Sequence, residues 1–225
     1  QPKQPLRVLT ADGVEVAGFG TERRVYKPID QISQLMKDSL LAVEDARFYE
    51  HGGLDPIGVA RAIVANLTGG RTQGASTITQ QVAKNFLLSS DQTMERKLKE
   101  AILAIRIERA FTKEQILELY LNRVYFGSGF YGAEAASQGY FGKPSMEMSI
   151  GQCATLAGLL KSPQALSPFN NPEDSQQARD FVLKRMRELG FITRKELEQE
   201  IGSPTAVVKR KNPFKVSYAI ELIRQ

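Results

Sequence analysis

Signals that start and stop helices recur through most of this chain, and they restrict it to a mainly α-helical fold. Thr112-Lys113-Glu114-Gln115 and Thr193-Arg194-Lys195-Glu196 have the sequence of a capping box, in which the Thr and the Gln or Glu three residues later satisfy the first N–H groups of a helix. Ser149 precedes a further apolar helix. Apolar residues at helical spacing, separated by Gly and Pro breaks, continue this pattern from about residue 32 almost to the end.

The predicted helices differ in how their apolar residues are arranged. The helix 57–68 follows Asp55-Pro56, which offers an N-cap and a proline at the first helical position. The most regular helix spans 91–109, and we expect its apolar stripe to face the core. That stripe consists of Met94, Leu98, Ala101, Ile102 and Ile105. The other predicted helices span residues 38–49, 78–88, 114–124, 150–161 and 173–189, with a short one after Thr193.

A small β element is predicted at the start of the chain. Leu6–Thr10 and Val14–Ala17 flank Ala11-Asp12-Gly13, and Asp-Gly between apolar runs is typical of a tight hairpin. The segment Arg23–Lys27 is a candidate third strand of this element.

Composition limits the partners without selecting one. The chain has 225 residues, of which 42% are hydrophobic, so it can bury a core. Its net charge of +5 favours an anionic partner: nucleic acid, a phospholipid surface or a phosphorylated substrate. The single cysteine, Cys153, lies in an apolar run and is interpreted as a small buried residue. No apolar run reaches the roughly 20 residues that cross a bilayer.

The stretch Val43–Gly53 is the first candidate for chemistry. It carries adjacent carboxylates and the only histidine, His51, next to an apolar approach. If this segment is helical, Glu44 lies at the edge of an apolar face, where partial desolvation raises its pKa toward the range of a general base. Glu44 and Asp45 also suit a solvated helix face, and His51 with two glycines also suits a helix end. The spacing leaves both readings open.

Two polar clusters follow on the next helices. They are Gln81, Lys84 and Asn85 on the helix 78–88, and Arg96, Lys97 and Glu100 on the helix 91–109. The second cluster can be read as ordinary salt bridges three and four residues apart. It can also be read as a site for a phosphate-bearing ligand, bound directly or with a metal ion.

Four motifs in order resemble those of the bacterial peptidoglycan glycosyltransferases (glycosyltransferase family 51), the domain found in class A penicillin-binding proteins. They are Glu44-Asp45-Ala46-Arg47-Phe48-Tyr49-Glu50-His51-Gly52-Gly53; Gly74-Ala75-Ser76-Thr77-Ile78-Thr79-Gln80-Gln81 with Lys84-Asn85; Arg96-Lys97-Leu98-Lys99-Glu100; and Ile116-Leu117-Glu118-Leu119-Tyr120-Leu121-Asn122. One such motif is weak evidence, whereas four in the family's order are specific. The similarity extends from about Ile32 to Ile201.

The resemblance implies a lysozyme-like helical fold and the polymerisation of lipid II into β-1,4-linked glycan with inversion at the anomeric carbon. Glu44 matches the family's general base, and Glu100 matches its second catalytic carboxylate. The residues that match its substrate site are Asp45, Phe48, His51, Thr77, Gln81, Lys84, Asn85, Arg96 and Lys97. No organic cofactor is implied, and a divalent cation, Mg²⁺ or Mn²⁺, is an expectation.

The resemblance also implies an organisation and a location. Residues 1–31 form the hairpin and lead-in, 32–204 the glycosyltransferase domain with a membrane-facing lobe at 57–75, and 205–225 a linker. No S-x-x-K occurs, so a transpeptidase domain is expected beyond Gln225 and a membrane anchor before Gln1. The expected partners are lipid II, the growing lipid-linked glycan and the outer face of the bacterial cytoplasmic membrane, and not nucleic acid.

Two other functions remain open on the sequence. A lytic transglycosylase or lysozyme-like enzyme also uses one key glutamate on a related helical fold, but it does not require the cations of the second cluster. A non-catalytic module that binds anionic lipid or nucleic acid would use only the positive charge.

Overall fold

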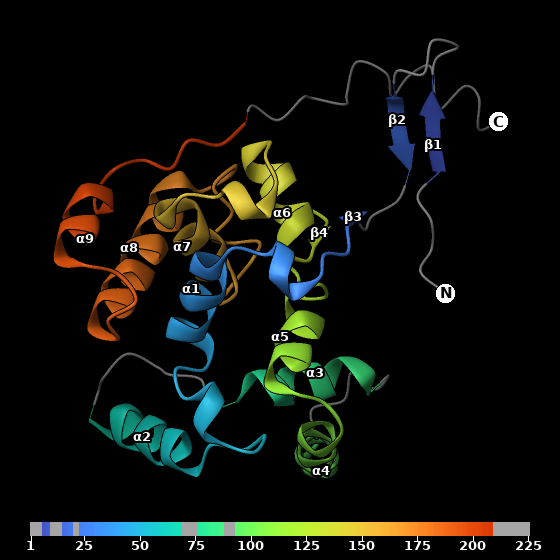
Figure 1. Cartoon of the computed structure of the whole chain (residues 1–225), viewed down its shortest axis with the longest axis vertical. Coiled ribbons are helices and arrows are strands. Elements are labelled where there is room, and N and C mark those ends of the chain that lie inside the picture. Colours follow the sequence, from blue (N-terminus) through green and yellow to red (C-terminus); the bar gives the residue numbers. More distant parts are fainter. Residues whose placement is uncertain (1–5, 10–14, 20–22, 69–75, 88–92, 209–225) are drawn as a thin grey trace.

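The computed structural model describes residues 6–9, 15–19, 23–68, 76–87 and 93–208, and within these ranges the chain is mainly α-helical (Figure 1). The helices are α1 Gln34–Glu44, α2 Pro56–Leu67, α3 Ile78–Phe86, α4 Met94–Ala110, α5 Lys113–Leu121, α6 Ala133–Phe141, α7 Ile150–Leu159, α8 Pro172–Glu188 and α9 Arg194–Glu200. Single 3₁₀ turns cover Ile29–Gln31, Phe48–Glu50 and Ser145–Glu147. The mainly helical fold predicted from the sequence is therefore confirmed.

The predicted helix starts carry the predicted caps. Complete capping boxes begin α3, α5, α7 and α9, each with a Ser or Thr hydroxyl that accepts the backbone N–H of a Gln or Glu three residues later. Asp55 precedes α2 as expected, but its carboxylate does not cap the helix. It lies 3.3 Å from Nη1 of Arg47 instead.

The helices form two groups that share the larger of two buried hydrophobic clusters. α1 packs against α7 and α8, and α3 packs against α4 and α5. The larger buried cluster joins both groups through residues such as Leu40 on α1, Ile78 on α3 and Leu117 on α5. The C-terminal end of α1 and the N-terminal end of α3 consequently meet where the two groups join.

The N-terminal strands depart from the prediction in one respect. β1 (Leu6–Leu9) pairs antiparallel with β2 (Glu15–Phe19) as predicted, although the turn lies outside the described residues. The expected extension of this hairpin by Arg23–Lys27 is wrong, because β3 (Arg23–Arg24) pairs in parallel with β4 (Phe130–Tyr131). The predicted loop 69–75 and the segment 209–225 also lie outside the described residues.

Hydrogen bonds from the C-terminal end of α5 fix the lead-in segment 26–29, which follows β3. Asn122 accepts the N–H of Lys27 and donates to its carbonyl oxygen, both at 2.8 Å. Glu118 accepts the N–H of Ile29 at 2.8 Å and the hydroxyl of Tyr26. Because residues 26–29 are held in this way, the preceding strand lies beside β4.

The apolar stripe predicted for the core side of α4 is mostly exposed, and this prediction is wrong. Met94 is 86% exposed, Leu98 63% and Ile102 46%, while Ala101 and Ile105 are half-buried. The buried face of α4 instead carries Glu100, Ala104 and Ile107. The stripe does follow the helical period, but the most apolar face of this helix is not its buried face.

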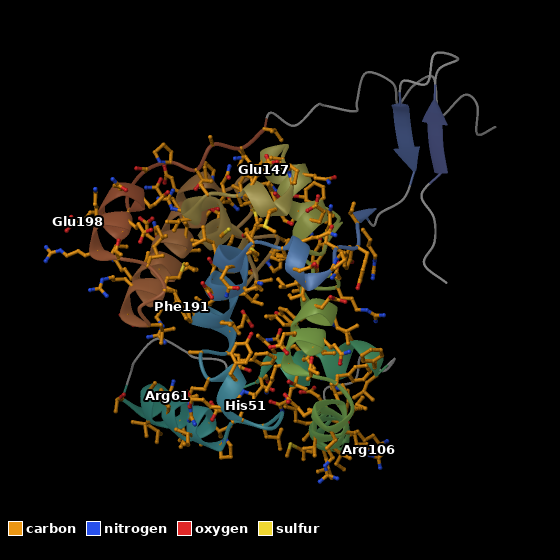
Figure 2. All side chains as sticks on the ribbon, viewed as in Figure 1. His51, Arg61, Arg106, Glu147, Phe191 and Glu198 are labelled. Atoms are coloured by element: carbon orange, nitrogen blue, oxygen red, sulfur yellow. The ribbon has the colours of Figure 1, made fainter. Side chains whose placement is uncertain are left out.

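A second exposed apolar face lies on α2. Ile57, Ile63, Val64 and Leu67 are all more than half exposed. α2 and α4 lie at the same end of the molecule in Figure 1, and Figure 2 shows Arg61 and Arg106 on these two helices. No helix among the described residues is both long and apolar enough to span a membrane.

Candidate active site

α1 ends at Glu44, and the following residue turns the chain toward α3. The predicted continuation of this helix to Tyr49 is wrong, because Asp45 has an extended φ of −161°. Its buried carboxylate accepts the N–H of Ile78 at 3.0 Å, at the first turn of α3. A carboxylate is favoured at a helix N-terminus, where backbone N–H groups are otherwise unpaired. Asp45 therefore joins the end of one helix to the beginning of another.

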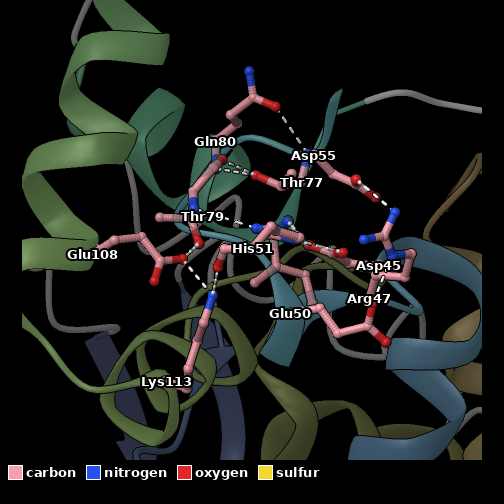
Figure 3. A network of polar contacts seen from close by, with 12 residues as sticks. Asp45, Arg47, Glu50, His51, Asp55, Thr77, Thr79, Gln80, Glu108 and Lys113 are labelled. Carbon is pink, nitrogen blue, oxygen red and sulfur yellow. Dashed lines mark hydrogen bonds and ion pairs between the residues drawn. The ribbon is translucent and has the colours of Figure 1, made fainter. Parts of the chain in front are cut away.

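His51 completes this junction (Figure 3). Its Nε2 lies 2.9 and 3.0 Å from the two carboxylate oxygens of Asp45, while its Nδ1 accepts the N–H of Gly53 at 3.2 Å. Since Nδ1 is an acceptor, the proton is on Nε2 and points to Asp45. The Thr77 hydroxyl donates to the carbonyl of Gly53 at 2.6 Å. The side chains of His51 and Thr77 thus hold the loop 45–53 against α3.

Phe48 supports the same loop from the core side. Its ring is buried, and Nζ of Lys113 lies 4.3 Å from the ring centroid. The same ammonium group donates to the carbonyl of His51 at 2.7 Å and to Glu108 at 2.8 Å. Phe48 and His51 therefore position the first motif and do not line its cavity.

Of the two readings that the sequence left open for Glu44, the structure agrees with the partly desolvated one. Burial raises the pKa of its carboxyl above the usual value of 4.5, and the negative charge of Asp45 raises it further. The amide of Gln81 donates to Oε2 of Glu44 at 2.6 Å and acts in the opposite direction, because it stabilises the ionised form. Glu44 lines a cavity of about 870 Å³, together with Asp45, Thr77, Gln81 and residues of α8.

The second predicted cluster surrounds an adjoining cavity of about 400 Å³. This cavity is lined by Ser76, Gln81, Lys84, Asn85, Arg96, Lys97, Glu100 and Tyr120, with further residues from 123–125 and Tyr131. Glu100 is only 2% exposed and forms an ion pair with Lys97, whose ammonium also donates to Ser76 at 3.1 Å. Nε of Arg96 is buried and has no hydrogen-bond partner among the described residues.

The two glutamates thus belong to neighbouring cavities. Glu44 lines the first and Glu100 the second, and Ser76 and Gln81 line both. The two cavities therefore meet at these shared residues. A sugar in the first cavity and a phosphate group in the second would therefore meet beside Gln81.

Carboxylates alone do not form a metal centre here. No group of three or more His, Cys, Asp or Glu side chains with metal-ligand geometry occurs among the described residues. Glu100 is a single carboxylate beside a lysine. This donor set fits Mg²⁺ or Mn²⁺ only where the ion takes its other ligands from phosphate oxygens and water. Cys153 plays no part, since burial raises the pKa of its thiol to about 12.

Sequence reasoning missed two parts of the site. Lys161, Gln177 and Arg185, from the end of α7 and from α8, line the cavity of Glu44, and no motif marked them. Tyr120 was assigned no role in the site from the sequence, yet its hydroxyl donates to Oε1 of Gln81 at 2.9 Å. Its place at the centre of the fourth motif was the available signal.

Comparisons with known proteins agree on one family. A family model described as Transglycosylase matches residues 12–187. Penicillin-binding protein 1A of Aquifex aeolicus is 45% identical over 225 residues, covering 99% of this chain and 31% of that protein. The Escherichia coli protein of the same name is 42% identical over 227 residues, covering 98% of this chain and 26% of that protein.

A solved structure supports the fold. The 2.6 Å crystal structure of penicillin-binding protein 1A from Haemophilus influenzae has a TM-score of 0.62 and 24% identity, covering 100% of this chain and 24% of that one. The chain spans less than a third of the length of these curated relatives.

Proposed function

This chain belongs to the transglycosylase family, and from that premise we propose that it polymerises lipid II into glycan strands of peptidoglycan. The observation that carries the proposal is the junction at Gln81. On one side is the partly buried carboxylate of Glu44, with a raised pKa, and on the other is a cavity lined by Lys84, Arg96 and Lys97. Synthesis from a diphosphate-linked donor requires both a base and cations, whereas glycan cleavage does not require the cations.

Glu44 acts as the general base in this proposal. Its carboxylate takes the proton of the acceptor's 4-hydroxyl as that oxygen attacks the anomeric carbon of the lipid-linked donor. A β-1,4 bond forms with inversion, the bond from the anomeric carbon to the diphosphate oxygen breaks, and polyprenyl diphosphate leaves. The cavity of about 870 Å³ that Glu44 lines would hold the acceptor.

The cations of the second cavity stabilise the leaving group. Negative charge accumulates on the diphosphate as its bond to the sugar breaks, and fixed positive charges close to it lower the barrier. Arg96 supports this role, because its buried Nε has no protein partner among the described residues and a phosphate oxygen would supply one. Glu100 holds Lys97 by an ion pair and assists on this side.

A divalent cation fits the same cavity. We propose that Mg²⁺ or Mn²⁺ is held beside Glu100 chiefly by the diphosphate of the donor, since the described residues offer too few carboxylates to bind it alone. Such an ion would supply further charge neutralisation at the leaving group.

The exposed apolar faces of α2 and α4 fit a membrane surface. A lipid-linked substrate keeps its polyprenyl chain in the bilayer, so the enzyme must lie against it. Leu67 and Leu98 are exposed on these faces, and Arg61 and Arg106 on the same helices would meet anionic headgroups (Figure 2). We place the domain at the outer face of the cytoplasmic membrane, in a longer protein that also carries a transpeptidase domain and an anchor.

Product length distinguishes this function from glycan cleavage. The chain should convert labelled lipid II into glycan of increasing length and should leave finished glycan unchanged, as seen by gel separation of the products. Shortening of finished glycan without polymerisation of lipid II would instead assign the chain to the lytic enzymes. Binding of lipid II without either reaction would assign it to the non-catalytic modules.

Leu98→Gln should weaken binding to anionic lipid vesicles by about tenfold, because a leucine side chain that enters an apolar phase gains on the order of 1.5–3 kcal/mol. The thermal midpoint should remain unchanged, since this side chain is exposed. Vesicle co-sedimentation measures the binding. Met146→Gln, a similarly exposed apolar side chain on the 3₁₀ turn Ser145–Glu147, is the matched control. Equal binding by both variants would contradict contact between α4 and the membrane surface.

A further inference from the structure

Three polar residues of the fourth motif lie at the C-terminal end of α5, and one of them faces a different way from the other two. Glu118 and Asn122 bind the lead-in segment 26–29, as described above. Tyr120 lies in the core, 1% exposed, and its hydroxyl donates to Oε1 of Gln81 at 2.9 Å. Tyr120 is therefore the member of this motif that reaches the site.

The contact continues from Gln81 to Glu44. Nε2 of Gln81 donates to Oε2 of Glu44 at 2.6 Å, so one amide bridges the phenol and the carboxylate. A glutamine side chain has an acceptor end and a donor end, and its orientation is decided by its partners. If the amide were reversed, its oxygen would face an oxygen of ionised Glu44, with no proton between them. The observed orientation is the one that suits a negative charge on Glu44.

The phenol of Tyr120 is a permanent donor in this arrangement. Burial raises the pKa of its hydroxyl well above the usual value of 10.0, and the charge of Glu44 adds to this effect. The hydroxyl therefore keeps its proton over any working pH. Because Oε1 of Gln81 accepts the hydrogen bond from this hydroxyl, the NH₂ group of the amide is directed to Glu44.

We propose that Tyr120 is a positioning residue that fixes the Gln81 amide so that it donates to ionised Glu44. The proposal rests on the proposed function of Glu44 as the base. A base must be ionised to accept a proton, and burial of Glu44 opposes its ionisation. The hydrogen bonds from Tyr120 to Gln81 and from Gln81 to Glu44 stabilise the ionised carboxylate, and they do so without a positive charge next to the base.

Other charged groups around Glu44 are the same in the unmodified protein and in the variants below. Asp45 adjoins it at the end of α1. The remaining charged residues that line its cavity come from the loop 45–55, α2, the end of α7 and α8: Arg47, Asp55, Arg61, Lys161, Asp174, Arg185 and Glu188. A difference in the acidic limb between the unmodified protein and a Tyr120 variant therefore reflects the hydrogen bonds from Tyr120 through Gln81 to Glu44.

Tyr120→Phe should move the acidic limb of the pH–rate profile to higher pH. Without the phenol, the amide of Gln81 is free to rotate, ionised Glu44 loses a donor, and its pKa rises further. Turnover on the acidic limb should fall by about tenfold, as expected for loss of a hydrogen bond to a charged group, with KM unchanged. The measurement is kcat and KM for lipid II polymerisation across the pH range.

Tyr140→Phe is the matched control. Tyr140 is also fully buried, and its hydroxyl donates to the carbonyl of Phe126 at 2.9 Å. This variant should lose stability and keep the position of the acidic limb. If Tyr120→Phe lowers turnover equally at every pH, Tyr120 has a structural role only and the proposal is overturned.

A double-mutant cycle tests the route of the effect. Gln81→Leu should move the limb in the same direction as Tyr120→Phe, and the double variant should show no further movement. Additive movements would overturn the proposal, because they would mean that Tyr120 does not act through Gln81.

A measurement on the unmodified chain covers the case in which Tyr120→Phe does not fold. With tyrosine labelled with ¹³C at Cζ, the Tyr120 signal should move as Glu44 ionises and should lose this movement in Glu44→Gln. A signal that does not respond to Glu44 overturns the proposal. Polymerisation by Glu44→Gln at the unmodified rate would instead reject Glu44 as the base, on which this proposal rests. An inactive Glu44→Gln together with an unchanged acidic limb in Tyr120→Phe rejects only the role of Tyr120.

Discussion

Glu44→Gln should reduce polymerisation of lipid II by about three orders of magnitude, which is within the range that a general base contributes. The variant is isosteric and can still accept the amide hydrogen of Gln81, so the cavity and substrate binding should persist. In the unmodified protein, turnover should fall as the pH decreases through the pKa of Glu44, because only the ionised carboxylate accepts a proton. Burial places that acidic limb above the usual range of a glutamate.

The control for this variant is Glu114→Gln. Glu114 lies in the first turn of α5, is exposed and lines neither cavity, so its turnover should match that of the unmodified protein. Rates are followed by gel separation of glycan made from labelled lipid II, and lipid II binding is measured separately. Polymerisation by Glu44→Gln at the unmodified rate would exclude Glu44 as the base.

Glu100→Gln should lower kcat by about a hundredfold, the scale expected when a preorganised electrostatic contact at the reacting centre is lost. Glu100 is buried and holds Lys97, which also reaches Ser76 at the boundary of the two cavities. Without the carboxylate, the ammonium group is no longer fixed where the diphosphate charge develops. KM should change little, because the cations that bind the ground state remain.

A second ion pair on α4 provides the control for Glu100. Glu95 and Lys99 are four residues apart, lie 2.5 Å from each other and are exposed. Glu95→Gln removes the same charge from the same helix, and it should leave kcat unchanged because exposed pairs contribute little. Equal losses of activity in both variants would indicate a general effect on α4 and would contradict a role for Glu100 at the reacting centre.

Local signals in the sequence predicted much of this fold. The capping boxes at Thr112 and Thr193 begin α5 and α9, and Ser149 begins α7. These signals succeed because a cap satisfies N–H groups within four residues of itself and does not depend on the rest of the molecule. Glu44 was a candidate from its own sequence surroundings, but its pairing with Glu100 could be predicted only through the resemblance of four motifs to one family.

The errors share a cause in long-range contacts. α1 ends at Glu44 because the carboxylate of Asp45 accepts an N–H of α3, 33 residues away in sequence. β3 lies beside β4 because α5 holds residues 26–29. The stripe on α4 follows the helical period, but a face that suits lipid has the same periodicity as one that suits a core. None of these contacts is visible in a window of ten residues.

The backbone turn at Asp45 places two consecutive carboxylates at opposite poles of two helices. Glu44 lies in the last turn of α1, where the peptide dipoles leave partial negative charge, while Asp45 reaches the first turn of α3, where they leave partial positive charge. Nearly identical side chains, one peptide unit apart, are thereby given contrary electrostatic surroundings. The carboxylate of Asp45 is held by its hydrogen bonds, whereas Glu44 is the carboxylate that takes a proton in the proposed function.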